Sequence, residues 1–423
     1  MSDINSYRVK QWQPQPRPDW VSRVNEEGTY LDIKSIVPLD EDSLINHAKA
    51  NTGLSDFGTE DWREAFQVFI KSLNDEADLN LMGRIMTRSD ILMYLEARLH
   101  LEDAYKRNPE INDVELAPHT LVVGSGRSGT SAMQNLLALD PDNGSPRHWE
   151  TLFPCPAPEA ATYFSDPRIA KADKIATQWE RVTPEMASVH EFRGDISTEL
   201  IHLQAGSFMN GGWLIFCGFT PTFDTYLAKR DNVASLVYAK RMLKLMQWKN
   251  PHKRWMLKSP DAMRYLPDLF KVFPDMQLVW MHRDPLKTVS SAVNMVGNIL
   301  WLRSDQALSD AAIAQITNPA GLAGMFNNVI DQMENGVFPA ERMRSVQYMD
   351  LISDPINTVA QMYRELGYEF SSTARVAMEK YVRENPREAR PPHKYSVGDE
   401  AKRAEERKLF ERYMTKFSVK TEL

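Results

Sequence analysis

The sequence is poor in cysteine, with only Cys155 and Cys217 among its 423 residues. Two cysteines exclude a disulfide framework and a cysteine-rich zinc site, and they fit a reducing compartment. Long hydrophobic runs are missing as well: the most apolar short run, 213–219, is far below the ~18–20 residues that span a bilayer. The first residues contain no apolar segment of the signal-peptide kind. We therefore expect a cytoplasmic protein without a membrane span.

Excess positive charge is also absent, because the formal net charge is −7. This balance argues against a surface that coats nucleic acid, so no nucleic-acid partner is expected. The fractions of hydrophobic residues, 43%, and of charged residues, 25%, are those of an ordinary globular protein. Any anion site must therefore be local and built from a few arginines, lysines and backbone N–H groups.

A glycine-rich segment, HTLVVGSGRSGTS at 119–131, carries the most information in the chain. Its apolar start predicts a strand, and the residues after it, TSAMQNLLAL, have a helical pattern. Strand, glycine loop and helix together form an arrangement in which backbone N–H groups bind a phosphate. A Walker A loop needs a lysine after its last glycine. Here Thr130 stands at that position and the cation is Arg127, so the loop suits a phosphate-like anion without being an ATP loop of that kind.

The order of patterns predicts an α/β fold: a P-loop-like parallel sheet flanked by helices. Further strands are expected at 254–259, 277–283 and 342–350, each separated from the next by helical patterns. The pattern of residues 1–117 predicts a helical N-terminal extension, and the pattern of residues 118–423 predicts the α/β domain. Within that domain, 150–250 predicts a helical insertion on the acceptor side of the sheet.

Cationic residues follow three of the expected strands. Arg127 follows the first, Lys258 ends the second and Arg283 ends the third. Ligands of open α/β sheets bind outside the carboxyl ends of the strands. Two such cations beside a glycine loop indicate a ligand with more than one anionic group.

These residues resemble the sulfotransferases that use 3′-phosphoadenosine 5′-phosphosulfate (PAPS). GSGRSGTS (124–131) resembles their 5′-phosphosulfate loop, and LVWMHRDPLKTVSS (278–291) resembles their 3′-phosphate segment, in which Arg283 and Ser291 would grip that phosphate. LKSP (257–260), RHWETLFPCP (147–156) and YMDLISDP (348–355) are typical of the broad bacterial branch. The resemblance implies PAPS as donor, no required metal, and a set of donor-binding residues: Ser125, Gly126, Arg127, Ser128, Gly129, Thr130, Ser131, Arg283 and Ser291.

The resemblance also implies catalytic roles. Arg127 and Lys258 would stabilise charge on the leaving phosphate and on the sulfuryl oxygens. The acceptor hydroxyl needs a general base. The cytosolic branch places a histidine two residues after its lysine, where this chain has Pro260. The tyrosylprotein branch uses a glutamate beyond the loop helix, and Glu150 is therefore the first candidate here. His148 is a close rival, and His190 and Glu199 are further ones.

Two other functions remain open at this point. A small-molecule kinase would need the Walker A lysine, which this chain lacks. A non-catalytic nucleotide-binding protein would not need both anion-binding segments, the glycine loop and 278–291. The acceptor is expected to be a small molecule with a hydroxyl group, alcohol or phenol. The aromatic residues of the insertion favour an apolar acceptor over a polysaccharide. The oligomeric state stays open.

Overall fold

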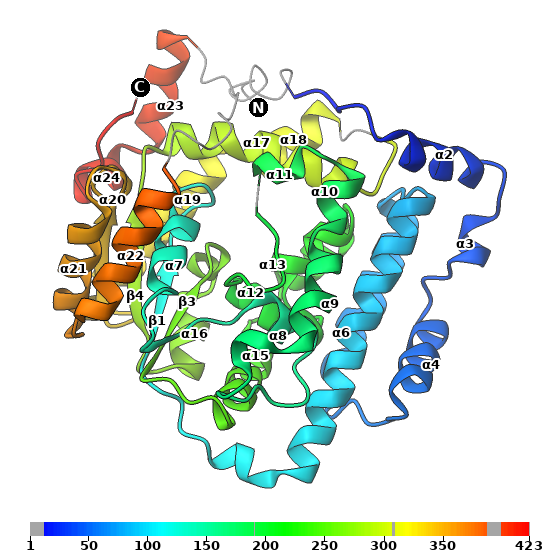
Figure 1. The fold of residues 1–423 in the computed structure, drawn as a ribbon. Coiled ribbons are helices and arrows are strands. Elements are labelled where there is room, and N and C mark those ends of the chain that lie inside the picture. Colours follow the sequence, from blue (N-terminus) through cyan, green and yellow to red (C-terminus); the bar gives the residue numbers. More distant parts are fainter. Residues whose placement is uncertain (1–11, 190, 307–308, 387–398, 423) are drawn as a thin grey trace.

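The computed structural model describes residues 12–422 except 190, 307–308 and 387–398. Its centre is a five-stranded sheet in the order β2-β3-β1-β4-β5, and all of its neighbouring strands are parallel. Helices flank this sheet (Figure 1), so the predicted fold class is confirmed. The strands are β1 (His119–Val123), β2 (Asn143–Gly144), β3 (Arg254–Lys258), β4 (Gln277–His282) and β5 (Met343–Gln347).

The three central strands are short apolar runs that are buried along nearly their whole length. Such continuous burial is expected of parallel strands that are covered on both faces. The register aligns Val122 with Lys258 and Val123 with Trp280, so that these strands end at one edge. After β1 the chain forms β2 and β3 on one side of β1 and then crosses to form β4 and β5 on the other side. The carboxyl ends of β1 and β4 therefore flank the switch point at which ligands of such sheets bind.

Two details differ from the sequence-based expectation. The edge strand β2 has only two residues, too few to leave a periodic pattern. The expected strand at 342–350 ends at Gln347, because Tyr348 begins a helix. The crossover helices around the sheet are α7 (Thr130–Leu137), α15 (Val233–Trp248), α16 (Leu266–Val272), α17 (Pro285–Trp301), α18 (Asp310–Ile316) and α19 (Pro319–Glu334).

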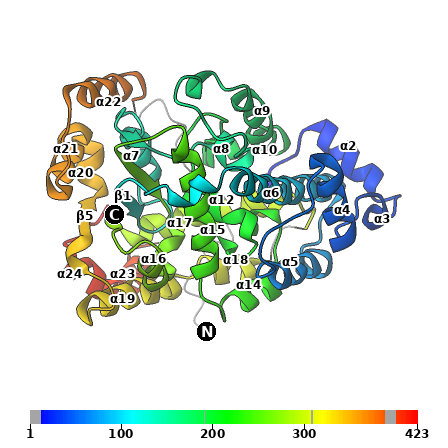
Figure 2. The same cartoon turned by 90° about the horizontal axis from the view of Figure 1, so that it is seen from below.

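The chain before β1 is helical, as predicted. Asp40 caps α4 by accepting from Ser43 N at 2.8 Å, and Gly53 ends the same helix in the left-handed conformation. In two views these helices gather on the side of the molecule away from the sheet (Figures 1 and 2). Leu101 and Tyr105 of the last of them share a core with β1, while the division at residue 117 stays a prediction. The helices are α2 (Asp19–Gly28), α3 (Ile33–Ile36), α4 (Glu41–Thr52), α5 (Arg63–Glu76) and α6 (Leu81–Arg107).

The segment between β2 and α15 contains several short helices, of which α8 and α12 lie between the sheet and α6 (Figure 2). Its aromatic residue Phe208 is fully buried and packs on Trp62 and Phe66 of the N-terminal part. The segment thus joins the two parts of the chain through its core. Its helices are α8 (His148–Leu152), α9 (Pro167–Ala176), α10 (Gln178–Val182), α11 (Met186–Val189), α12 (Leu200–Gln204), α13 (Gly211–Leu214) and α14 (Pro221–Leu227).

The helices after β5 pack beside the sheet near α7 and α19 (Figure 1). They are α20 (Tyr348–Ser353), α21 (Pro355–Leu366), α22 (Ser372–Glu384), α23 (Glu400–Leu409) and α24 (Glu411–Lys416). Across the described part of the chain, every helix is too short or too polar to cross a bilayer.

Candidate active site

The glycine loop turns sharply between β1 and α7. Arg127 and Gly129 both adopt left-handed backbone conformations, with φ of 68° and 94°. A Cβ at Gly124 would lie 2.6 Å from Ser128 Oγ, and one at Gly129 would lie 2.6 Å from the ring of Tyr348. These two positions therefore need glycine for space as well as for conformation. The N–H groups of the first turn of α7 have no acceptor within their own helix, which leaves them available to an anion.

The other residues of the loop close its turn or begin the helix that follows. Ser128 donates from both its backbone N and its Oγ to the carbonyl of Ser125, at 3.2 and 2.7 Å. These bonds close the turn and hold its shape. A Cβ at Gly126 would meet nothing within 4 Å, so the loop is open at that residue. Thr130 and Ser131 begin α7.

The two predicted anion-binding segments meet at the switch point. Arg127 Nε donates to Ser291 Oγ on α17 at 2.9 Å, and Arg283 Nη1 donates to the carbonyl oxygen of Arg127 at 2.8 Å. Residues that are 156 and 164 positions apart in sequence are thereby in direct contact. The guanidinium of Arg283 also lies over the ring of Tyr348, 3.9 Å from its centroid. Arg283 Nε and Nη2 donate to the two carboxylate oxygens of Glu422, at 2.9 and 3.0 Å.

Lys258 ends β3 beside the first turn of α7. Its side chain is buried, and its Nζ donates to Ser131 Oγ at 3.3 Å and forms an ion pair with Glu199. Burial lowers the pKa of Lys258 from its ordinary value, and the Glu199 carboxylate opposes that shift. A buried ammonium in this position places positive charge between the loop and a carboxylate.

Glu199 reaches Lys258 because an irregular segment is held in place by backbone pairing. His148 N donates to Ile196 O at 3.0 Å and Thr198 N donates to Pro146 O at 2.7 Å. Gln134 of α7 adds a bond from its Nε2 to the carbonyl of Thr198 at 2.7 Å. The start of α12 is thus fixed against both the loop helix and the start of α8.

Comparison with known proteins decides the family. The family model described as "Sulfotransferase family" matches residues 118–372, the range that contains every cation described above. The chain belongs to the sulfotransferase family.

Two solved sulfotransferases share most of its length. STF1 from Mycobacterium tuberculosis H37Rv is 28% identical with a TM-score of 0.70, and the match covers 89% of this chain and 98% of that one. STF9 from Mycobacterium avium is 23% identical with a TM-score of 0.79, and the match covers 90% of this chain and 97% of that one. No curated protein sequence matches this chain. The similarity to both structures extends beyond the family match into the N-terminal helices.

In this sulfotransferase, Glu150 lies inside α8 and is fully buried. Its Oε2 accepts from Arg147 N at 2.7 Å and from Tyr163 OH at 2.8 Å. These bonds cap α8 in the manner of a capping box. Burial raises the pKa of Glu150 to about 7. The hydrogen bonds of Glu150 thus connect it to the start of α8 and to Tyr163, whereas Glu199 contacts Lys258.

The raised pKa of Glu150 predicts a pH-dependent stability. The unfolded chain releases this proton near pH 4.5, whereas the folded protein keeps it until about pH 7. The free energy of unfolding should therefore fall as pH rises between these values, by roughly 3 kcal/mol in total for this group. Glu150→Gln removes this titrating group. The difference in free energy of unfolding between the variant and the wild type, measured by urea unfolding, should therefore grow in favour of the variant from pH 5 to pH 8. Parallel pH profiles of the two proteins would show that Glu150 is ionised in both states.

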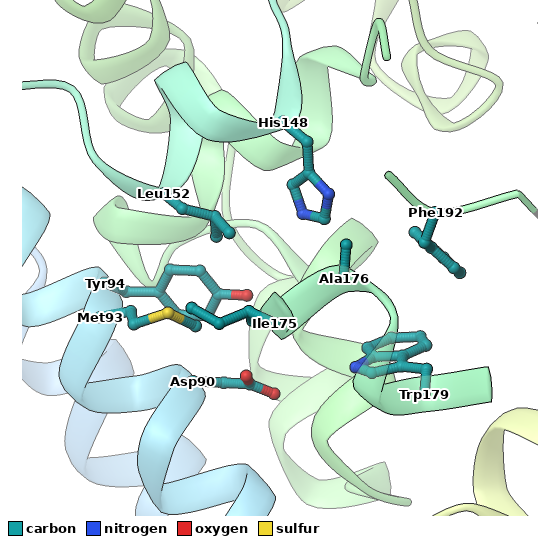
Figure 3. A pocket seen from close by; sticks show the side chains of 9 residues that line it. All are labelled: Asp90, Met93, Tyr94, His148, Leu152, Ile175, Ala176, Trp179 and Phe192. Atoms are coloured by element: carbon teal, nitrogen blue, oxygen red, sulfur yellow. The ribbon is translucent and has the colours of Figure 1, made fainter. Parts of the chain in front are cut away.

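His148 faces a small cavity between α6, α8, α9 and α10 (Figure 3). The volume of this cavity is about 10 Å³, close to the room that one water molecule needs. Its wall is mostly apolar and aromatic, and Asp90 lies at its α6 end, paired with Arg303 at 2.5 Å. The lining residues are Asp90, Met93, Tyr94, His148, Leu152, Ile175, Ala176, Trp179 and Phe192.

A second histidine, His202, connects this cavity to the cationic site. The rings of His148 and His202 are 5.4 Å apart. Glu199 N donates to His202 Nδ1 at 3.3 Å, and Thr198 Oγ1 lies 2.7 Å from the same nitrogen. Sequence analysis missed His202, although its spacing of three residues from Glu199 at the start of a helix was a usable signal. His190, another candidate for the base, lies outside the described residues.

Proposed function

We propose that this sulfotransferase transfers a sulfuryl group from PAPS to the hydroxyl group of an apolar small molecule. The observation that supports the donor is the meeting of Arg127, Ser291 and Arg283 at one switch point. PAPS carries a 3′-phosphate and a 5′-phosphosulfate, so it needs two anion-binding groups beside each other. The loop with Arg127 suits the phosphosulfate, and Arg283 with Ser291 suits the 3′-phosphate.

The donor supplies an activated sulfuryl group, and the protein supplies position and charge. Sulfuryl transfer resembles phosphoryl transfer, in which an in-line displacement depends on both of these. A sulfuryl group bears less charge than a phosphoryl group, so arginine and lysine side chains suffice without a metal ion. The N–H groups of the loop and Arg127 hold the phosphosulfate. Lys258, beside Ser131, is placed to stabilise negative charge as the leaving phosphate forms.

Glu199 is the base that this geometry favours. Among the described residues, the Glu199 carboxylate forms an ion pair with Lys258. An acceptor oxygen that approaches the sulfuryl group would therefore come within reach of Glu199. Its partner Lys258 becomes free to interact with the donor once the donor binds, which leaves the Glu199 carboxylate to accept the proton of the hydroxyl group. Of the first choices from sequence, His148 contacts the ring of His202, and Glu150 is bonded to Arg147 N and Tyr163 OH.

The side chains around the cavity beside His148, and not its volume, favour an apolar acceptor. Its walls include Tyr94, Trp179 and Phe192, and aromatic rings of this kind bind flat apolar molecules. The cavity has room for about one water molecule, so an acceptor must displace some of these side chains to enter. The N-terminal helix α6 would then form part of the acceptor site.

Thermal shift with three nucleotides tests the proposed donor. In the presence of EDTA, 3′,5′-ADP should raise the melting temperature, while ADP and ATP should raise it less at the same concentration. A kinase would instead respond to ATP with Mg²⁺ and ignore the 3′-phosphate. A larger shift with ATP and Mg²⁺ than with 3′,5′-ADP would contradict the proposed function.

Arg283 should carry the recognition of the 3′-phosphate. Arg283→Ala should weaken the binding of 3′,5′-ADP by about 1.5–3 kcal/mol, the scale of charge-assisted hydrogen bonds. Calorimetry with 5′-AMP provides the control ligand, because 5′-AMP lacks the phosphate that Arg283 binds and should lose much less. Equal losses for the two nucleotides would show that Arg283 does not contact the 3′ group.

A further inference from the structure

We propose that Glu422 is an internal competitor for the donor's 3′-phosphate and thereby sets the affinity of the protein for its donor. The carboxylate of Glu422 binds the guanidinium of Arg283, which is the group assigned above to the 3′-phosphate. This proposal rests on the proposed function, since it takes Arg283 as a donor-binding residue. It adds a determinant that lies outside the matched family range of 118–372.

The contact is a forked ion pair. Arg283 Nε donates to Glu422 Oε1 at 2.9 Å, and Arg283 Nη2 donates to Glu422 Oε2 at 3.0 Å. The side chains are 13% and 10% exposed, so water screens the pair only partly. A carboxylate and a phosphate present the same pair of oxygens to a guanidinium. Glu422 therefore satisfies Arg283 in the way that a phosphate of the donor would.

The segment that carries Glu422 is anchored at both ends. Glu422 N donates at 2.9 Å to Asp284 Oδ2, a fully buried carboxylate that also caps α17. At the other end, the ring of Phe417 stacks on His282 with centroids 4.4 Å apart, and Gln347 Nε2 donates to the carbonyl of Phe417 at 2.8 Å. Between these anchors, Lys420 and Thr421 are exposed. Residues 417–422 thus form a strap, which keeps the carboxylate beside Arg283 at a high effective concentration.

This arrangement separates two kinds of nucleotide. A nucleotide with a 3′-phosphate must displace Glu422 from Arg283 and loses part of its binding free energy in doing so. A nucleotide without that phosphate binds at the glycine loop while the ion pair stays intact. After sulfuryl transfer, the product 3′,5′-ADP still carries the 3′-phosphate, so return of Glu422 to Arg283 also favours its release. Glu422 therefore lowers the affinity of the protein only for nucleotides with a 3′-phosphate, which are the donor and the product.

Calorimetry on Glu422→Gln tests this competition with a variant of nearly the same shape. The dissociation constant for 3′,5′-ADP should fall about 5- to 30-fold relative to the wild type, the range of a partly buried charge-assisted pair. The dissociation constant for 5′-AMP should change by less than about twofold, because its binding leaves Arg283 paired. Glu422→Asp keeps the charge on a shorter side chain and should give an intermediate gain for 3′,5′-ADP.

The control is Glu405→Gln, which removes the same charge from an exposed position of α23. It should bind both nucleotides like the wild type, which excludes a general effect of net charge. Unchanged or weaker binding of 3′,5′-ADP to Glu422→Gln would overturn the proposal, since Glu422 would then be indifferent or would orient Arg283 for the donor. Absence of 3′,5′-ADP binding to every variant and to the wild type would instead contradict the proposed function, and this inference with it.

Discussion

Lys258→Ala should lower the turnover number by about 10²–10³-fold while it changes the affinity for 3′,5′-ADP by less than about threefold. The ammonium of Lys258 is buried and touches Ser131 and Glu199, so under the proposed function its charge acts at the reacting centre and away from the 3′-phosphate. A cation that interacts mainly with charge formed on the leaving phosphate stabilises the transition state and adds little to binding in the ground state. Steady-state kinetics combined with calorimetry measures the two quantities separately.

Lys253→Ala is the matched control for this variant. Lys253 directly precedes β3, is 69% exposed at its side chain, and pairs with Asp142 at the opposite end of the strand. Its removal should leave both turnover and nucleotide binding near the wild-type values. If Lys258→Ala loses turnover and 3′,5′-ADP affinity in parallel, Lys258 is a binding residue and the proposed catalytic role is wrong.

Glu199→Gln should lower turnover by about 10²–10⁴-fold with an aliphatic alcohol, the usual contribution of a general base. Its loss should shrink with an acidic phenol, which gives up its proton with less help. Lys258→Ala should show no such dependence on the acceptor, because its effect falls on the leaving group. A plot of the loss against the pKa of the acceptor, measured for both variants, separates these two roles.

The same series decides between Glu199 and Glu150. Glu150→Gln should keep turnover within a few-fold of the wild type, because Glu150 is bonded to Arg147 N and Tyr163 OH. A loss for Glu199→Gln that is equal for all acceptors would reduce Glu199 to a counter-ion of Lys258. A large, acceptor-dependent loss for Glu150→Gln would restore the prediction made from sequence.

The residues proposed to bind the donor could be predicted from sequence because they lie at or just beyond the ends of strands. Arg127 lies in the loop that follows β1 and Arg283 comes directly after β4, and parallel strands bring their carboxyl ends to one edge. The contact between Arg127 and Ser291 depends only on that edge and on the first two turns of α17. Pattern, spacing and resemblance therefore agree on this half of the site.

The acceptor side does not follow in the same way. Glu199 meets Lys258 because residues 194–198 pair with residues 146–149, and such irregular pairing leaves no periodic signal. Glu150 stands near the loop helix in sequence, yet its carboxylate turns back to cap α8. Glu422 lies 139 positions after Arg283, in a segment whose residues form no recognisable motif. Contacts between distant loops depend on tertiary packing, which sequence patterns do not encode locally.

Transfer of a labelled sulfuryl group tests the central claim most directly. The protein is incubated in EDTA with PAPS that carries ³⁵S, together with a panel of phenols and apolar alcohols, and both products are quantified. The account predicts a labelled organic product formed in amounts equal to 3′,5′-ADP, dependent on the acceptor and lost in Lys258→Ala. Tight binding of 3′,5′-ADP with no acceptor-dependent transfer of label across the whole panel would contradict it and would indicate a nucleotide-binding protein without this activity.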